Sequence, residues 1–224
     1  MVSCGRNSYG IAHTYIIESL IVITQPNCKM YSTETTKASN PGVVQRKPRH
    51  LNPIMFFDIS IEGEAVGRLT FELRADIVPK TCENFKALIT GERGKTKEGI
   101  DLCYKDAVFH RIVKDYLIQG GDIMNQNGTG RISSFGDLFE DENFILQHTG
   151  PGILSMCNSG PDSNGTQFFI TLVETSWLNG RHVAFGCLVD QESFDVLAKI
   201  EAVGHDCGRP STTVLISECG QVFP

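Results

Sequence analysis

The chain has 224 residues, of which 41% are hydrophobic, and this suits one domain of about 150–200 residues plus an extension. Residues 1–50 hold six Lys or Arg and two acidic residues, so their net charge is +4, whereas the whole chain carries −6. Residues 51–224 therefore carry −10. A domain this acidic is a poor candidate for binding nucleic acid, and we expect no such partner.

Residues 1–50 differ in composition from the rest, being rich in Ser and Thr and poor in acids. We interpret them as an extension, either disordered or a targeting leader, with the polar run from Ser32 to His50 as a linker. We expect a cytoplasmic protein; a cleaved mitochondrial presequence and a secretory signal are the alternatives. The apolar patch from Tyr15 to Thr24 contains Glu18 and is shorter than the roughly 20 residues of a membrane span, so no membrane partner is expected.

From Pro53 the pattern becomes rich in β-forming residues. Residues 54–61 and 66–73 read as two strands joined by a hairpin loop at 62–65. Pro79 then begins a helix that Gly91 ends. Further strands are expected at 108–113, 152–156, 167–171, 183–188 and 213–218, with a second helix from about Glu192 to Val203 before the last of them. Many short strands without βαβ alternation predict an antiparallel barrel or sandwich, with the helices covering its open ends.

The eight cysteines form no C-x-x-C pair and no Cys/His cluster with zinc-finger spacing. We interpret them mainly as reduced thiols of an intracellular protein. Glu140, Asp141 and Glu142 are read as a solvated loop rather than a metal site, because hard cations need several converging oxygens. We therefore expect no metal and no cofactor.

The most informative candidate site residues lie in Phe109-His110-Arg111-Ile112, which is followed by Gln119-Gly120-Gly121-Asp122. An arginine among apolar neighbours is costly to bury unless its charge is used. Arg111 is therefore the best candidate for a residue with a direct functional role.

Several further motifs follow in order: the turn at 127–130, the run 148–160, the run 164–170, Trp177-Leu178, and His182 to Gly186. At these residues the chain resembles the cyclophilin family, the cyclosporin-binding peptidyl-prolyl cis-trans isomerases. The likeness extends from about Asn52 to Gln221. It implies a mainly β fold, a closed eight-stranded antiparallel β-barrel capped by two α-helices, over residues 51–224.

The resemblance also implies roles for individual residues. Arg111 matches the catalytic arginine, Gln119 matches the glutamine that helps to hold it, and Phe169 and His182 complete the catalytic set. The implied substrate-binding surface comprises Tyr116, Leu117, Gly128, Cys157, Asn158, Ser159, Gln167, Trp177 and Leu178. The implied activity is isomerisation of X–Pro bonds in peptides and unfolded proteins, by a monomer that also binds cyclosporin-type inhibitors. Phe168 is expected in the core, because its side chain should face opposite Phe169.

The chain departs from the family pattern in places that leave alternatives open. Tyr116 and Leu117 replace the usual pocket Phe and Met, and Cys157 and Ser159 flank Asn158 in place of two alanines. A proline-peptide binding module or chaperone with weak isomerase activity is therefore the alternative. A Ser or Cys hydrolase is disfavoured, because Ser155 and Cys157 have no G-x-S-x-G elbow and no evident base nearby.

The segment from Gly94 to Lys105 resembles the insertion of divergent-loop cyclophilins, some of which are thought to use cysteines for redox control. The expected helix cysteine is Ile89 here, whereas Cys219 is present and Cys103 lies inside the insertion. This departure weakens a redox hypothesis, since thiol reactivity also needs an exposed, electropositive setting.

Overall fold

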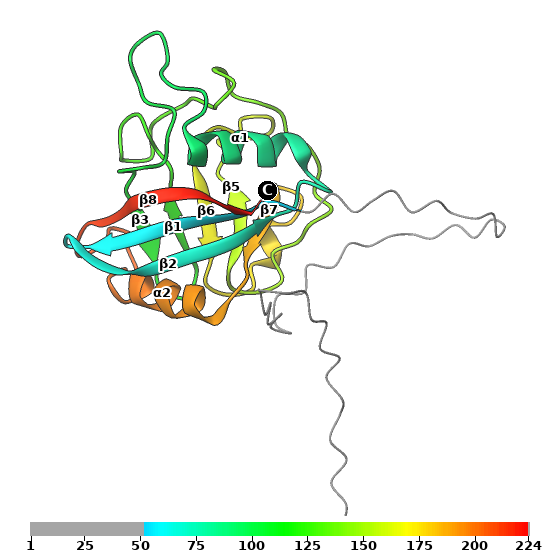
Figure 1. The fold of residues 1–224 in the computed structure, drawn as a ribbon. Helices are drawn as coiled ribbons and strands as arrows, with labels where there is room; N and C mark the ends of the chain where they lie inside the picture. The colour runs from blue at the N-terminus through cyan, green and yellow to red at the C-terminus, as the bar shows by residue number, and fades with distance from the viewer. Residues whose placement is uncertain (1–51, 224) are drawn as a thin grey trace, which may run out of the picture.

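A computed structural model describes residues 52–223; the predicted extension, residues 1–50, lies outside them. The described part contains eight strands, two α-helices and one short 3-10 helix (Figure 1). The strands are β1 (Ile54–Ile61), β2 (Glu64–Leu73), β3 (Arg111–Val113), β4 (Leu117–Gly120), β5 (Ile153–Met156), β6 (Phe168–Thr171), β7 (Ala184–Leu188) and β8 (Val214–Phe223). The helices are α1 (Pro79–Thr90), η1 (Ser176–Leu178) and α2 (Gln191–Ala202).

All eight strands belong to one antiparallel sheet, in the order β3-β4-β6-β5-β7-β2-β1-β8. Figure 1 shows α1 and α2 on opposite sides of this sheet. The prediction of a mainly β fold with two helices is therefore confirmed.

The prediction of a closed barrel is wrong, because the sheet forms an open half-barrel with β3 and β8 at its edges. The chain before β3 does meet β8 through a single bridge between Val108 and Leu215, flanked by backbone hydrogen bonds such as Phe109 N to the Val214 oxygen at 3.0 Å. Asp106 has a positive φ of 66°, which breaks the extended conformation of this segment. The pairing with β8 therefore ends on the N-terminal side of the bridge, and the segment adds no continuous strand to the sheet.

Local turn chemistry explains the strand boundaries that the sequence missed. The first hairpin loop contains only Glu62 and Gly63, with φ of 54° and 85°, which fits a two-residue hairpin turn. Glu64 and Ala65 pair with β1 instead of forming the predicted loop. Strand β4 was not predicted, and β3 begins at Arg111 rather than at residue 108.

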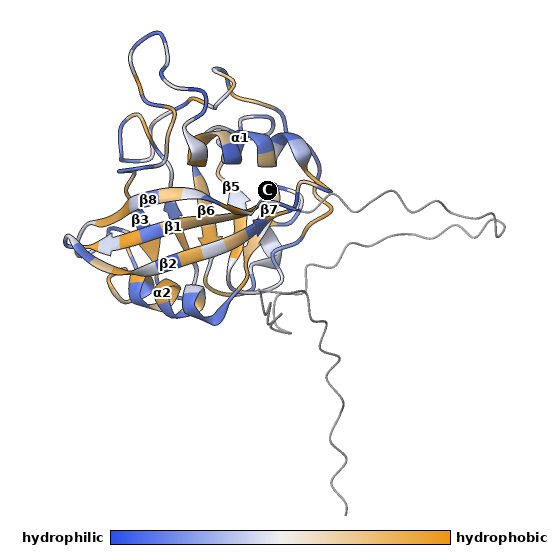
Figure 2. Cartoon of the chain, viewed as in Figure 1, coloured by the Kyte–Doolittle hydropathy of each residue, from blue (hydrophilic) through white to orange (hydrophobic). Residues whose placement is uncertain are grey.

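The main core lies between the sheet and α1 and is dominated by aromatic rings. Phe85 of α1 lies 4.7 to 5.9 Å, between ring centroids, from rings on the strands and on the segment before β3: Phe57, Phe71, Tyr104, Phe168 and Phe185. Figure 2 shows hydrophobic and hydrophilic positions alternating along β1 and β2, as a half-buried sheet requires. Phe168 belongs to this core, as predicted.

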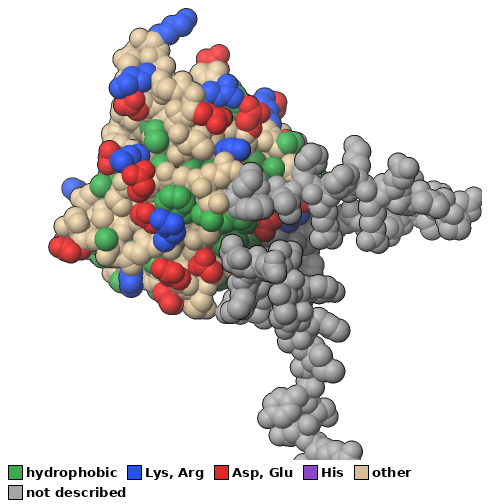
Figure 3. Space-filling model, in the orientation of Figure 1, with side chains coloured by type: hydrophobic (Ala, Val, Ile, Leu, Met, Phe, Trp, Pro, Cys, Tyr) green, Lys and Arg blue, Asp and Glu red, His purple; other side chains and the backbone are tan. Residues whose placement is uncertain are grey.

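Both helices have the ends that the sequence indicates. Pro79 occupies the first turn of α1, and Gly91 ends it in the left-handed conformation with its N–H donating to the Ala87 oxygen. Asp190 caps α2 by accepting a hydrogen bond from the Ser193 N–H at 2.8 Å. Within residues 52–223, neither helix has the length and apolar character needed to cross a bilayer. Figure 3 shows acidic and basic side chains interspersed over the visible surface.

Candidate active site

The register of three neighbouring strands places the candidate catalytic residues in one row. Arg111 on β3 lies opposite Gln119 on β4, which lies opposite Phe169 on β6. Directly opposed residues of antiparallel strands have Cβ atoms about 4.5–5.5 Å apart and point to the same face. The residues that alternate with them are buried in the main core: Ile112, Ile118, Phe168 and Ile170. The row therefore faces away from the core, toward a separate surface.

A second, smaller apolar cluster lies on that outer face. Leu117, Phe169 and Leu178 are buried together, and Tyr116 and Cys157 pack against them. Leu178 is supplied by η1, whose other large side chain, Trp177, is 58% exposed and stacks on Tyr116 with 6.1 Å between ring centroids. The cluster is thus an apolar floor with an exposed aromatic edge, and the predicted pocket residues are brought together there.

Two histidines hold the Phe169 ring in place. His148 stacks on it with 5.7 Å between centroids, and His182 contacts its edge at 5.4 Å. The Nδ1 of His182 donates to the Met156 carbonyl oxygen at 3.0 Å, which fixes the tautomer, since a carbonyl only accepts. Burial lowers the pKa of His182, although the Met156 bond and Asp141 act in the opposite direction. At neutral pH this side chain is therefore a neutral wall of the site.

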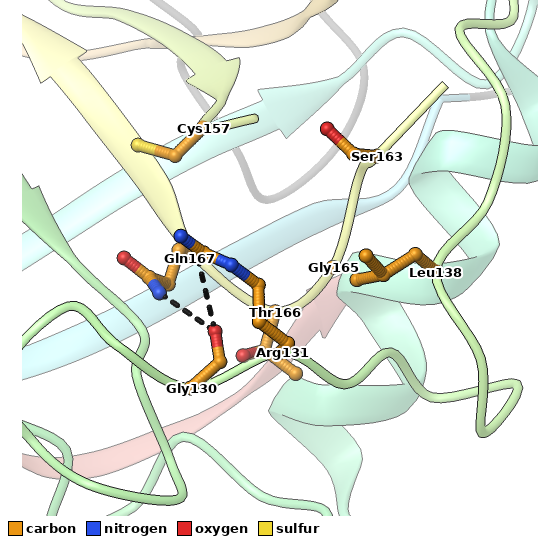
Figure 4. Close-up of a pocket in the computed structure, with 8 residues that line it drawn as sticks. All are labelled: Gly130, Arg131, Leu138, Cys157, Ser163, Gly165, Thr166 and Gln167. Atoms are coloured by element: carbon orange, nitrogen blue, oxygen red, sulfur yellow. Dashed lines mark hydrogen bonds between the residues drawn. The ribbon is translucent and has the colours of Figure 1, made fainter. Parts of the chain in front are cut away.

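A network of amides connects the row to the neighbouring loop. Gln119 Nε2 donates to Gln167 Oε1 at 3.1 Å, and Gln167 Nε2 donates to the Gly128 and Gly130 oxygens, each at 3.0 Å. Figure 4 shows the Gln167 side chain turned toward Gly130, with Arg131 beside it. Because Gln167 is bonded on both sides, the position of Gln119 is set by the loop at 127–130.

The loop itself is organised by Asp122, a buried carboxylate at the end of the Gln119-Gly120-Gly121-Asp122 motif. Its oxygens accept backbone N–H groups from Met124, Asn125, Asn127, Gly128 and Gly130, at 2.8 to 3.2 Å. Burial acts to raise the pKa of Asp122, but these N–H donors outweigh it and lower the pKa. Asp122 therefore positions the loop that supports Gln167, a role that the sequence did not reveal.

Arg111 is exposed and makes no ion pair within residues 52–223. Its side-chain stem lies over Gly208, where an added Cβ would be 3.1 Å from Arg111 Cγ and 3.2 Å from Nε. Gly208 also accepts the Ile112 N–H at 2.8 Å. Sequence reasoning missed Gly208, because only the folded chain brings residue 208 beside residue 111.

The strand register places Arg111 on the face that carries the apolar cluster, and its positive charge acts on Cys157, which packs against that cluster. Burial raises the pKa of Cys157 to about 12, while the positive charges of Arg111 and Arg131 oppose this rise. The thiol therefore stays protonated at neutral pH and is no nucleophile. Arg111 thus presents an uncompensated cation to an apolar surface.

The remaining predicted residues form the rim. Asn158 Nδ2 donates to the Arg181 oxygen at 2.7 Å, and the backbone N–H of the exposed Ser159 donates to Ser163 Oγ at 2.9 Å. Gly128 lies on the loop next to Gln167, as expected. A cavity of about 350 Å³ continues from this rim and is lined by Asp141, Phe144, Asn158, Gly160, Pro161, Gly180, Arg181 and His182.

One expectation about Ser155 is corrected. The sequence indicated no base near it, yet His148 Nε2 lies 2.9 Å from Ser155 Oγ, and His148 Nδ1 lies 2.8 Å from Asn179 Oδ1. Both Ser155 and His148 have no exposed surface, so a substrate carbonyl cannot reach the hydroxyl. This Ser-His-Asn arrangement therefore supports the Phe169 ring from behind rather than acting as a hydrolase.

The contact between Gly208 and Arg111 makes a testable prediction. A Gly208→Ala substitution should lower kcat/KM for an X–Pro peptide about tenfold, because the added methyl group displaces the arginine stem and small misplacements are costly. Gly63→Ala is the matched control: its φ of 85° nearly equals the 84° of Gly208, but no atom lies within 4 Å of its added Cβ. Equal kcat/KM in both variants would contradict the assigned contact.

The comparison with protein families agrees with this arrangement. The family model described as cyclophilin type peptidyl-prolyl cis-trans isomerase/CLD matches residues 56–221, which is more than half of the chain. Enzymes of this family are isomerases that act on proline-containing peptides. The match confirms the resemblance seen in the motifs, and the chain belongs to the cyclophilin-type peptidyl-prolyl cis-trans isomerases.

Proposed function

We propose that this domain accelerates rotation about X–Pro bonds through Arg111, which stabilises the half-rotated amide. One observation carries the proposal: Arg111 stands in register with Gln119 and Phe169, makes no ion pair within residues 52–223, and lies on the face of the sheet that carries the apolar cluster. Because Arg111 is exposed and paired with no carboxylate in that part of the chain, its guanidinium donors are available to a peptide bound beside it.

The chemistry of the bond explains why one cation suffices. Amide resonance gives rotation a barrier of about 18–20 kcal/mol. At the twisted transition state the resonance is lost, the prolyl nitrogen becomes pyramidal, and it gains a lone pair that can accept a hydrogen bond. A guanidinium aimed at this nitrogen binds the twisted state more strongly than either planar state, and such differential binding lowers the barrier. The arginine stays protonated, so no net proton transfer is required.

The apolar cluster would hold the proline ring of the substrate still during the rotation. The pyrrolidine ring would rest on Leu117, Phe169 and Leu178. Each of these side chains is at most 8% exposed. The peptide on the other side of the bond would lie along Asn158 and Ser159 at the rim. Gln119, held by Gln167, would bind the peptide backbone and support Arg111. The ring is thus held while the preceding carbonyl turns, which keeps the reacting groups aligned.

The same surface is proposed to bind cyclosporin-type inhibitors. Trp177 is exposed beside the pocket, and an indole N–H is a suitable donor at such an edge. The hydroxyl group that Tyr116 adds to the family pattern is not left buried without a partner, and leucine is close to methionine in volume. Tyr116 and Leu117 are therefore compatible with a working pocket.

A direct test is nuclear magnetic resonance exchange spectroscopy on an X–Pro peptide with the full chain added in catalytic amounts. We expect cis and trans signals of the peptide to exchange within seconds, against tens to hundreds of seconds without enzyme. Shifted or broadened signals without exchange would instead identify a proline-peptide binding module or chaperone. Added cyclosporin should abolish the exchange if it occupies the same pocket.

Other aspects of the function stay predictions from the sequence. These are action on unfolded proteins during folding, a monomeric state, and a cytoplasmic location, or a mitochondrial one if residues 1–50 are a cleaved presequence. Sequencing the N-terminus of the native protein would decide between the two compartments, because cleavage would leave a start near residues 40–50.

A further inference from the structure

Two thiols meet at the C-terminal end of α1, away from the row of Arg111, Gln119 and Phe169. Cys103 lies inside the insertion at 94–105, which projects from the fold in Figure 1, and Cys219 lies on β8. Both sulfurs lie against this last turn of the helix, with Cys103 Sγ 3.6 Å from the position of a Cβ on Gly91, and the two thiols interact with each other. Cys219 Sγ also lies 3.2 Å from the Ile89 oxygen, and both cysteines are half-buried.

We propose that Cys103 and Cys219 are an oxidisable dithiol, which a hydroperoxide converts into an intramolecular disulfide. The bond needs the sulfurs at about 2.05 Å, and both sulfurs already lie beside the same helix turn, one near Gly91 and the other near the Ile89 oxygen. From the sequence, Cys219 had no partner cysteine, because position 89 is isoleucine where a cysteine was expected. In the folded chain Ile89 is buried in the main core, and the partner is supplied by the insertion instead.

The backbone on both sides holds the pair in place. Cys219 is opposite Phe57 in the β1–β8 ladder, so its strand is fixed by regular pairing. The residue after Cys103 donates its N–H to the Leu88 oxygen at 2.8 Å, and Cys103 Sγ lies 3.6 Å from the position of a Cβ on Gly91. The last turn of α1 therefore positions both thiols, and the meeting of the two is built into the fold rather than left to loop motion.

The surroundings make the two sulfurs unequal. The hydrogen bond with Cys219 and the backbone N–H of Lys105, whose nitrogen is 3.4 Å from the sulfur, lower the pKa of Cys103 to about 6 against the opposing effect of burial. The same contact raises the pKa of Cys219. Glu218 and Asp101 oppose the thiolate of Cys103 only weakly, and Glu218 is paired with the Lys105 ammonium group. Cys103 is thus the attacking thiolate and Cys219 the resolving thiol.

The oxidation balances in two steps. The Cys103 thiolate attacks one oxygen of the hydroperoxide, the O–O bond breaks, and the other oxygen leaves as hydroxide or alkoxide and takes a proton from water. This leaves Cys103 as a sulfenic acid. The Cys219 sulfur then attacks the Cys103 sulfur, its thiol proton leaves with the departing hydroxyl as water, and the disulfide forms. Two electrons pass from the thiols to the peroxide, and the insertion becomes covalently tied to β8.

The test is peptide mapping of the full chain after treatment with one equivalent of hydrogen peroxide at pH 7, with free thiols alkylated. We expect one linked peptide pair joining Cys103 to Cys219, two hydrogens lighter than the reduced pair. Cys219→Ser should stop at a sulfenic acid on Cys103 that dimedone traps, whereas Cys103→Ser should give neither product. Cys207→Ser is the matched control, because Cys207 is exposed and its loss should leave the link unchanged.

Two outcomes would overturn the proposal. One is oxidation of Cys207 before Cys103 in the wild-type protein, which would show that exposure rather than the thiol pair controls reactivity. The other is retention of both thiols as alkylated cysteines after peroxide has been consumed. Because the decisive map is made on the wild-type chain, a folding defect in either serine variant cannot hide these outcomes.

Discussion

Replacing Arg111 with alanine should lower kcat/KM for an X–Pro peptide by about 10²- to 10³-fold in a protease-coupled assay. Removing one donor that acts only on the transition state costs about 2.7–4 kcal/mol. The fold should persist, because Arg111 is exposed and has no ion pair within residues 52–223 to lose. The melting temperature measured beside the assay should therefore change by only a few degrees.

Arg111→Lys is the control for charge. Lysine keeps the positive charge but lacks the planar fork of donors, so we expect activity between that of the wild type and that of Arg111→Ala. If Arg111→Ala kept full activity, the proposed role would be refuted. If Arg111→Lys were fully active, charge alone rather than the directed donor would be the working feature.

The second large effect concerns two neighbouring phenylalanines that face opposite sides of β6. Phe169→Leu should lower kcat/KM about tenfold, because the floor for the proline ring loses its aromatic surface, and small changes in an apolar pocket are worth about 1–3 kcal/mol. The variant should remain folded, since Leu117 and Leu178 keep the outer cluster apolar.

Phe168→Leu is the matched substitution one residue away. Phe168 lies in the main core within 6 Å, between centroids, of four rings: Phe57, Phe85, Tyr104 and Phe109. We expect this variant to lower the free energy of unfolding by about 1–3 kcal/mol while the folded enzyme keeps most of its kcat/KM. Thermal melts and assays on both variants would show the separation; the reverse pattern would mean that the two faces of β6 are wrongly assigned.

Much of the fold follows from local sequence patterns. A run of β-forming residues predicts β1, and alternating residues predict most of β2. Pro79 and Gly91 mark the ends of α1. Each of these signals acts within a few residues. Strand β4 escaped prediction because Leu-Ile-Gln-Gly is short and ends in glycine. The open edge between β3 and β8 escaped it too, because it depends on the conformation of Asp106 and on pairing between segments about a hundred residues apart.

The site, like the fold, has features that the sequence predicts and features that only the folded chain shows. The motifs that carry Arg111, Gln119 and Phe169 are visible in the sequence, and their residues come together on one face of three strands. The contacts of Gly208 with Arg111 and of His148 with Ser155 are not visible, because each depends on side chains that only the folded chain brings together. Sequence reasoning therefore finds the groups that bear the chemistry more readily than those that hold them.

The central claim is that an unpaired guanidinium beside an apolar pocket lowers the barrier of the bound X–Pro bond without strengthening its planar states. The most direct measurement is the cis-trans exchange rate of a fully bound X–Pro peptide, by nuclear magnetic resonance, in the wild type and in Arg111→Ala. We predict that the variant binds the peptide with nearly the same Kd but exchanges it at least a hundredfold more slowly. An unchanged exchange rate in the bound state would contradict the account.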